Sequence, residues 1–205
     1  MSNGFLWAFN WILSVECPKS GSCFSDHPTD PGGATNWGIT HTEWEKYLVR
    51  NSLPPKDIRS VTHEDAADFY REIWEGDIVS QVHDVAGSRM ALIVFDAIVN
   101  TGPNTAVICL QRTIETLVDR HQWNNCTDLM AIDGKFGPNT RQVLFEWCQT
   151  FAVPLIEEQF LWERIEHYRK IAKSWTAAGK IRAAATWLPV WVNRMFRLHE
   201  VISND

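Results

Sequence analysis

The run of residues from Glu16 to Thr40 contains several side chains that could act together in acid–base chemistry. Glu16 ends an apolar segment, and Asp26 and Asp30 follow in a stretch rich in Pro, Gly and Ser. Two carboxyl groups in different surroundings can divide the roles of general acid and general base between them. The run therefore predicts a proton-transfer site, with Glu16 as the acid.

Asp30 ranks ahead of Asp26 as the second carboxylate of this site. Asp30 begins an Asp-Pro-Gly-Gly turn that can present its side chain rigidly, whereas Asp26 lies beside the segment from Cys17 to Cys23. An Asp before Pro-Gly often serves only its own turn, so a purely structural role for Asp30 stays open.

The segment before Glu16 predicts the element that positions it. Phe5, Phe9 and Ile12 recur at helical spacing, and Glu16 falls on the same stripe. We therefore expect a helix that ends near Glu16 and directs its side chain toward the core. A carboxyl group held against apolar walls can stay protonated near neutral pH, as a general acid requires.

These residues carry a resemblance to a known family. Glu16 and the sequence Asp-His-Pro-Thr-Asp-Pro-Gly-Gly-Ala-Thr-Asn-Trp-Gly-Ile-Thr over residues 26–40 resemble the signature of the glycoside hydrolase family 108 muramidases, lysozyme-like enzymes of phages and bacteria. The closing Trp191-Val192-Asn193-Arg194 is also similar, so the resemblance covers nearly the whole chain. One departure is that the family has two glycines directly after the catalytic Glu, where this chain has Cys17 to Cys23.

The resemblance implies a mainly α-helical, lysozyme-like fold with a small turn-rich or hairpin lobe after the first helix. It implies an N-acetylmuramidase that cleaves the β-1,4 bond between N-acetylmuramic acid and N-acetylglucosamine, with Glu16 as acid and Asp30 as base or stabiliser. No metal or organic cofactor is required. The remaining candidates are side chains that could bind sugar in the cleft: His27, Thr35, Asn36, Trp37, Thr40 and Asn100.

The C-terminal half contains a second resemblance. Residues 133–140, Asp-Gly-Lys-Phe-Gly-Pro-Asn-Thr, resemble part of the peptidoglycan-binding modules of wall hydrolases. Turn formation and a helix start at Pro138 explain the same residues locally, and we favour that structural role for the individual side chains. We expect a catalytic region over residues 1–100 and a helical C-terminal region over residues 101–205, packed into one body.

Capping and periodicity predict further helices. Thr40 and Thr62 each begin a capping pattern, and residues 88–99 are almost continuously apolar, as in a buried helix. Asp96 and Asn100 lie one helical turn apart, so they either satisfy buried polar groups or line a cleft.

Two more helices are expected near the C-terminus. One begins at Pro154 and runs to about Trp175, and the final helix begins within residues 187–194. Arg194 can pair with a buried carboxylate, and we favour a structural ion pair for it.

Composition restricts the class of protein. With 45% hydrophobic and 21% charged residues the chain is typical of a soluble globular protein. The net charge of −6 argues against attachment to nucleic acid or membranes through the overall field, so recognition must be local. Of eleven tryptophans we expect about two or three in a cleft, Trp37 first, and the rest in the core.

Cysteine usage leaves two alternatives. Cys17 and Cys23 can close a small loop in an oxidising compartment, or they can join His27 as three of the four ligands that zinc needs. A zinc site would need a fourth ligand that the sequence does not indicate, whereas a disulfide needs only the two cysteines.

The apolar segment over residues 4–15 predicts a helix better than a signal peptide or anchor, because no Lys or Arg precedes it and it is too short to span a bilayer.

We expect a protein made in the cytoplasm without a cleavable signal peptide and released with a holin or a secretion system. We expect it to act as a monomer on glycan strands of the periplasmic or extracellular cell wall. A lytic transglycosylase and a non-catalytic wall-binding protein are the alternative functions.

Overall fold

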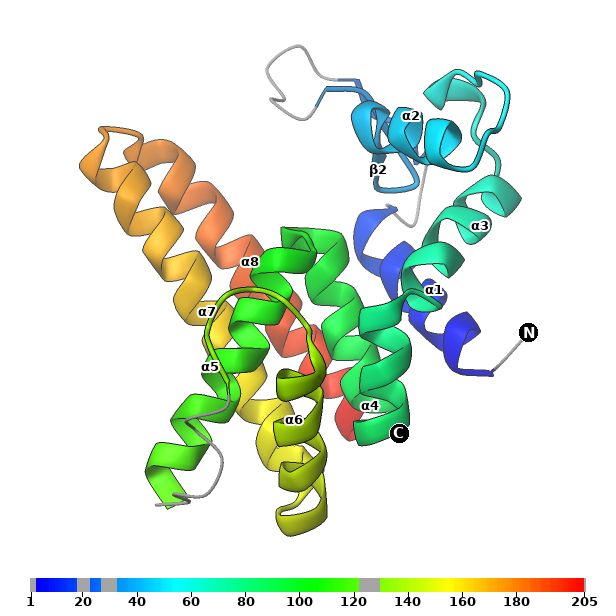
Figure 1. Ribbon diagram of the computed structural model, residues 1–205. Helices are drawn as coiled ribbons and strands as arrows, with labels where there is room; N and C mark the ends of the chain where they lie inside the picture. The colour runs from blue at the N-terminus through cyan, green and yellow to red at the C-terminus, as the bar shows by residue number, and fades with distance from the viewer. Residues whose placement is uncertain (1–2, 18–22, 27–32, 122–129, 205) are drawn as a thin grey trace. The chain divides into compact units, whose positions relative to one another are not determined.

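The computed structural model describes residues 3–17, 23–26, 33–121 and 130–204 (Figure 1). The chain divides into two units, Met1–Gly76 and Asp77–Asp205, and each is described by itself. The expected mainly α-helical, lysozyme-like fold with a small hairpin after the first helix is confirmed. No described helix is long and apolar enough to cross a membrane.

The first unit is built on two helices that share an aromatic core. Helix α1 (Asn3–Glu16) packs against α3 (His63–Trp74). Phe5, Phe9 and Ile12 are buried as the stripe predicted, and the rings of Phe9 and Tyr70 lie 5.8 Å apart. This packing holds the end of α1, and therefore Glu16, in place.

Between these helices lies a short hairpin followed by two small helical elements. Strands β1 (Thr35–Asn36) and β2 (Ile39–Thr40) pair antiparallel and lead into α2 (His41–Arg50) and the 3₁₀ helix η1 (Ile58–Ser60). Thr40 caps α2 by accepting a hydrogen bond from the backbone of Glu43, and Thr62 forms a reciprocal capping box with Asp65 at α3. Both predicted helix starts are confirmed.

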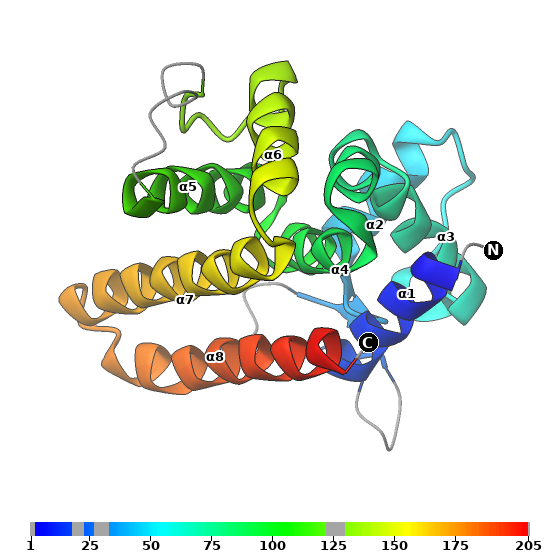
Figure 2. The ribbon, with the colours of Figure 1, turned by 90° about the horizontal axis from the view of Figure 1, so that it is seen from below.

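The second unit contains five helices among the described residues: α4 (Asp77–Thr101), α5 (Pro103–His121), α6 (Pro138–Thr150), α7 (Val153–Ala177) and α8 (Ile181–Ser203). Helices α7 and α8 form a long antiparallel hairpin, which Figures 1 and 2 both show.

The buried helix expected over residues 88–99 is confirmed as the second stretch of α4, and one predicted helix start in this unit is wrong. Gly87, with a φ of 83°, separates this stretch by a kink from the first stretch of α4, which begins at Asp77. Helix α8 begins at Ile181 rather than within residues 187–194, and it contains Pro189 in its interior. The alanines over residues 183–185 favour this earlier start.

A buried carboxylate joins three helices of the second unit. Asp96 is fully buried on α4 and accepts hydrogen bonds from Arg164 of α7 and Arg194 of α8, each at 2.7 Å. The hydroxyl of Tyr168 donates to Asn100, and Arg164 donates to that hydroxyl. The structural ion pair expected of Arg194 is confirmed, and these five residues are called the Asp96 cluster below.

The boundary predicted at residue 100 separates functions, whereas the boundary in the structure separates compact units. The two units separate after Gly76, whereas the predicted boundary separates a catalytic region from a wall-binding region. The predicted functional division stays a prediction.

We expect Asp96→Ala to lower the free energy of unfolding by about 3–5 kcal/mol, because it leaves the buried guanidinium of Arg164 without its counter-ion. Urea denaturation measures this loss. Glu166→Ala is the matched control on α7, since its exposed pair with Arg169 contributes at most about 1 kcal/mol. Equal losses for the two variants would contradict a structural role for the Asp96 cluster.

Candidate active site

Glu16 is the last residue of α1 and is half-buried. The chain continues the helical hydrogen-bond pattern for one more residue, since the amide of Cys17 donates to the carbonyl of Leu13 at 3.0 Å. A disulfide joins Cys17 to Cys23. Both sulfur atoms are therefore bonded to each other, which overturns the zinc alternative for these cysteines.

The hairpin turn packs directly against Glu16. Trp37 and Gly38 connect β1 to β2 with φ angles of 55° and 78°, as a tight two-residue hairpin turn requires. A Cβ atom at Gly38 would lie 2.7 Å from both Cβ and Cγ of Glu16. Only glycine therefore allows the turn to approach the Glu16 side chain this closely.

Three hydrogen bonds hold the hairpin in place. The hydroxyl of Tyr70 donates to the carbonyl of Trp37 at 2.9 Å, and the indole N–H of Trp37 donates to the carbonyl of Val61 at 3.0 Å. The side-chain amide of Asn36 donates to the backbone carbonyl of Ile58 at 2.9 Å. The turn is thus fixed from the η1 segment and from α3 while it contacts Glu16.

The predicted sugar-binding residues of the hairpin have different surroundings. Asn36 is buried and its amide bonds backbone carbonyls, so its amide nitrogen has a structural role. The hydroxyl of Thr40 caps α2. Thr35 and Trp37 are half-buried, and Trp37 packs edge-on against His63 at 5.4 Å. Binding of sugar by these residues stays a prediction.

Of the two candidate second carboxylates, the structure describes only Asp26. Ser25 pairs with Thr35 through two backbone hydrogen bonds of 2.8 Å, which form an isolated β-bridge beside the hairpin. Asp26 follows the bridge, is exposed, and accepts a hydrogen bond from Arg59 at 3.2 Å. Asp30 and His27 lie outside the described residues.

Asn100 belongs to the second unit, where it accepts the hydrogen bond from Tyr168 in the Asp96 cluster. Its predicted place in the cleft therefore stays a prediction, beside an observed structural role.

Sequence reasoning missed Tyr70 and His63 as residues that shape this site. Tyr70 was not among the predicted site residues, yet its hydroxyl fixes the carbonyl of Trp37. His63 contacts both Phe9 and Trp37 and so links α1 to the hairpin. The available signal was the tyrosine itself, because a buried hydroxyl requires a hydrogen-bond partner.

The sequence around this site matches the model of a known protein family. Residues 9–102 match the family model of glycosyl hydrolase 108. The match contains Glu16, the hairpin, Tyr70 and Asn100, and it supports a glycosidase. No curated protein sequence matches the chain.

A solved structure shares the fold of the chain. It is described as the structure of Brucella abortus SagA and is 22% identical in sequence, with a TM-score of 0.57. The alignment covers 94% of this chain and 97% of that chain. The similarity therefore extends over both units, including the part of this chain beyond the family match.

Gly38→Ala and Gly33→Ala form a matched pair that tests the contact with Glu16. Both glycines have positive φ angles, so alanine costs about 1–2 kcal/mol of backbone strain at each position. A Cβ atom at Gly33 meets no atom within 4 Å, whereas at Gly38 it meets Glu16. We expect Gly38→Ala to lower the free energy of unfolding, measured with urea, clearly more than Gly33→Ala. Equal values would contradict the close packing of Glu16 against the turn.

Proposed function

We propose that this protein is a peptidoglycan hydrolase of the muramidase type, which cleaves the β-1,4 bond between N-acetylmuramic acid and N-acetylglucosamine. The observation that carries the proposal is the position of Glu16. It ends α1, is half-buried, and packs against a glycine-containing turn within the segment that matches glycosyl hydrolase 108.

Glu16 acts as the general acid in this proposal. Hydrolysis of a glycosidic bond requires a proton for the leaving oxygen while an oxocarbenium-like centre forms in the sugar. The Trp37–Gly38 turn, which Tyr70 of α3 fixes, packs against the Glu16 side chain and lowers the cost of aligning it with that oxygen.

Asp30 is the proposed second group, as a base that activates water or as a stabiliser of the charged sugar. Asp26 is the competing residue, and its hydrogen bond with Arg59 favours a role in holding the loop. Thr35, Trp37, His27 and Asn100 are proposed to contact the sugar, while Asn36 and Thr40 are proposed to maintain the hairpin that supports them.

The proposed place of action is the periplasmic or extracellular cell wall. The disulfide between Cys17 and Cys23 supports an oxidising compartment, because such bonds persist outside the cytosol. Synthesis in the cytoplasm, release with a holin or a secretion system, and action as a monomer complete the proposal. Host-cell lysis and local wall remodelling are the two roles compatible with it.

Glu16→Gln tests the acid role with the least change in shape. We expect the release of reducing sugar ends from purified peptidoglycan to fall by about a hundredfold or more, because the amide cannot donate the proton. Glu43→Gln, an exposed glutamate of α2 paired with Lys46, should retain the rate of the unmodified protein. A Glu16→Gln variant that remains folded and active would contradict the proposal.

Asp30→Asn and Asp26→Asn separate the two candidates for the second group. We expect a loss of about a hundredfold in hydrolysis rate for Asp30→Asn and a change of less than about threefold for Asp26→Asn. Rates of sugar release with circular dichroism as a check on folding measure the difference. The reverse order would assign the role to Asp26.

A further inference from the structure

Four aromatic rings lie along the contact between α7 and α8, in the second unit. We call Tyr168, Trp175, Trp187 and Trp191 the aromatic strip. The ring of Trp191 is central: its centroid lies 5.0 Å from Tyr168, 5.5 Å from Trp175 and 6.4 Å from Trp187. Its plane is inclined by 23° to Tyr168 and by 24° to Trp187, so Trp191 stacks on both rings.

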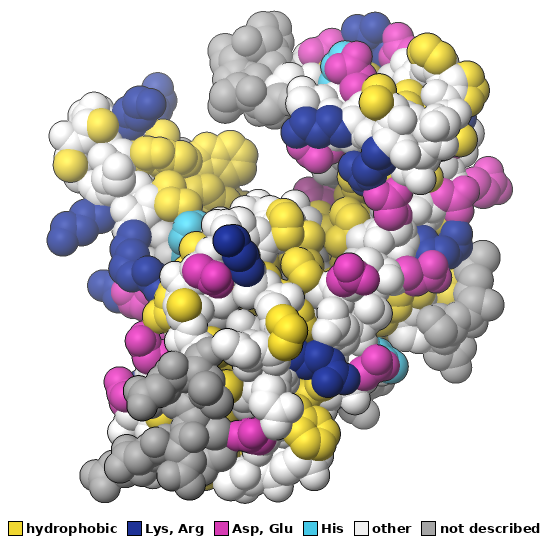
Figure 3. All heavy atoms as spheres, viewed as in Figure 1, with side chains coloured by type: hydrophobic (Ala, Val, Ile, Leu, Met, Phe, Trp, Pro, Cys, Tyr) yellow, Lys and Arg dark blue, Asp and Glu magenta, His cyan; other side chains and the backbone are white. Residues whose placement is uncertain are grey.

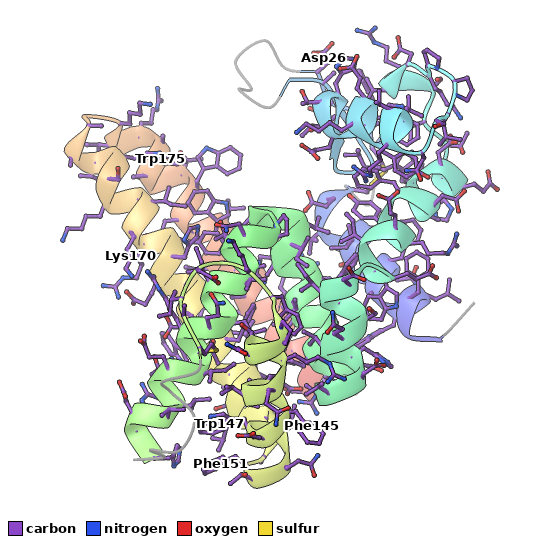
Figure 4. All side chains as sticks on the ribbon, in the orientation of Figure 1. Asp26, Phe145, Trp147, Phe151, Lys170 and Trp175 are labelled. Atoms are coloured by element: carbon purple, nitrogen blue, oxygen red, sulfur yellow. A yellow bond between two sulfur atoms is a disulfide. The ribbon has the colours of Figure 1, made fainter. Side chains whose placement is uncertain are left out.

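The strip becomes more exposed toward the closed end of the hairpin. Tyr168 is buried, Trp191 and Trp175 are half-buried, and Trp187 is 48% exposed. Figure 3 shows hydrophobic side chains gathered on one side of the α7–α8 hairpin, and Figure 4 places Trp175 toward its closed end. Large flat apolar surfaces are therefore available to a ligand at this end.

The Asp96 cluster holds the strip rigid at its buried end. Tyr168 donates to Asn100 and accepts from Arg164, which fixes the ring on which Trp191 stacks. Arg194 lies one helical turn after Trp191 on α8 and is bonded to Asp96. A ligand that stacks on this strip would meet rings that are already ordered, so binding would cost little side-chain entropy.

The hairpin carries a charge opposite to that of the whole chain. The hairpin over residues 153–203 has eight basic and five acidic residues, a net charge of +3 in a chain of net charge −6. Seven of the basic residues lie within residues 166–197, where Glu166 is the single acidic residue; Arg194 is paired with Asp96 and Arg169 with Glu166, and the others are Lys170, Lys173, Lys180, Arg182 and Arg197. Figure 3 shows Lys and Arg side chains at the closed end of this hairpin and along its side away from the hydrophobic patch. A polymer with negative charges would therefore be attracted to the hairpin although the protein is acidic.

We propose that the aromatic strip of the second unit binds the glycan strand of peptidoglycan by stacking on its sugar rings. Sugar rings present apolar C–H faces that pack on tryptophan, and the net positive charge of the hairpin attracts the carboxylates of the peptide stems. The identity of the polymer rests on the proposed function.

The strip suits this role better than the segment predicted from sequence. In the turn over residues 133–140, Gln111 donates to Asp133 and accepts from the amide of Gly134, and Thr140 also bonds Gln111. The amide of Lys135 and the side chain of Gln111 hold the pKa of Asp133 below its usual value by bonding the carboxylate. These polar groups stabilise the turn, as we favoured for the individual residues, whereas the rings of the strip offer surface to a ligand.

The test measures binding to purified peptidoglycan by co-sedimentation, with Glu16→Gln in every protein so that the polymer stays intact. We expect the added pair Trp175→Ala and Trp187→Ala to weaken binding about tenfold or more, since each stacked ring contributes a few-fold in affinity. Trp162→Ala is the matched control, because Trp162 is 60% exposed on the same helix and lies outside the strip. The control should bind as tightly as the parent.

A second pair, Trp175→Tyr and Trp187→Tyr, keeps aromatic faces and should retain most of the binding. This pair shows that loss in the alanine variant comes from the rings and not from misfolding. Glycan strands freed of their peptide stems should still bind in a strip-dependent manner. Equal binding by the strip variants and the control would overturn the proposal, as would strip-dependent binding to anionic phospholipid vesicles without binding to glycan.

The outcome for the strip and the outcome for the proposed function are distinguishable. Strip-dependent binding together with no sugar release by the protein that retains Glu16 would overturn the hydrolase and support the strip. Sugar release with unchanged binding by the strip variants would support the hydrolase and overturn the strip.

Discussion

The close approach of Gly38 to the Glu16 side chain is the constraint on which the proposed site depends. The turn can contact Glu16 only because Gly38 has no Cβ atom and accepts a positive φ angle. Tyr70 and Val61 then fix the turn through their hydrogen bonds with Trp37. The carboxylate at the end of α1 is consequently positioned by a hairpin that is itself held by α3 and the segment before it.

A buried charge has the corresponding role in the second unit. Asp96 forms ion pairs with both Arg164 and Arg194 and thereby joins α4, α7 and α8. Burial of three charged groups is tolerated because each makes direct, short hydrogen bonds with its partner. The same cluster orients Tyr168, so the rigidity of this unit and the order of its aromatic surface have one physical origin.

Sequence reasoning succeeded where one local rule determined the outcome. The apolar spacing of Phe5, Phe9 and Ile12 predicted the first helix and its buried face, and capping threonines predicted two helix starts. It failed at the start of α8, where the helix propensity of the alanines before Pro189 outweighed the boundary that proline usually marks.

The site was predicted less completely than the fold because its geometry depends on contacts between distant segments. The residues next to Asn36 do not indicate that its side-chain amide donates to the carbonyls of Ile58 and Val61. Those next to Tyr70 likewise do not indicate that its hydroxyl bonds the carbonyl of Trp37. Glu16 was recognised from its motif, and the residues that surround it were found only in the structure. The role of Asp30 stays a prediction because it lies outside the described residues.

Digestion of purified peptidoglycan in water enriched in heavy oxygen tests the central claim most directly. The account predicts that each released fragment carries one heavy oxygen atom at a new reducing N-acetylmuramic acid end, because water attacks the sugar after Glu16 donates its proton. Mass spectrometry detects the added mass. Anhydro-muramic ends without heavy oxygen would contradict it and identify a transglycosylase, and the absence of any released sugar would contradict an enzymatic role.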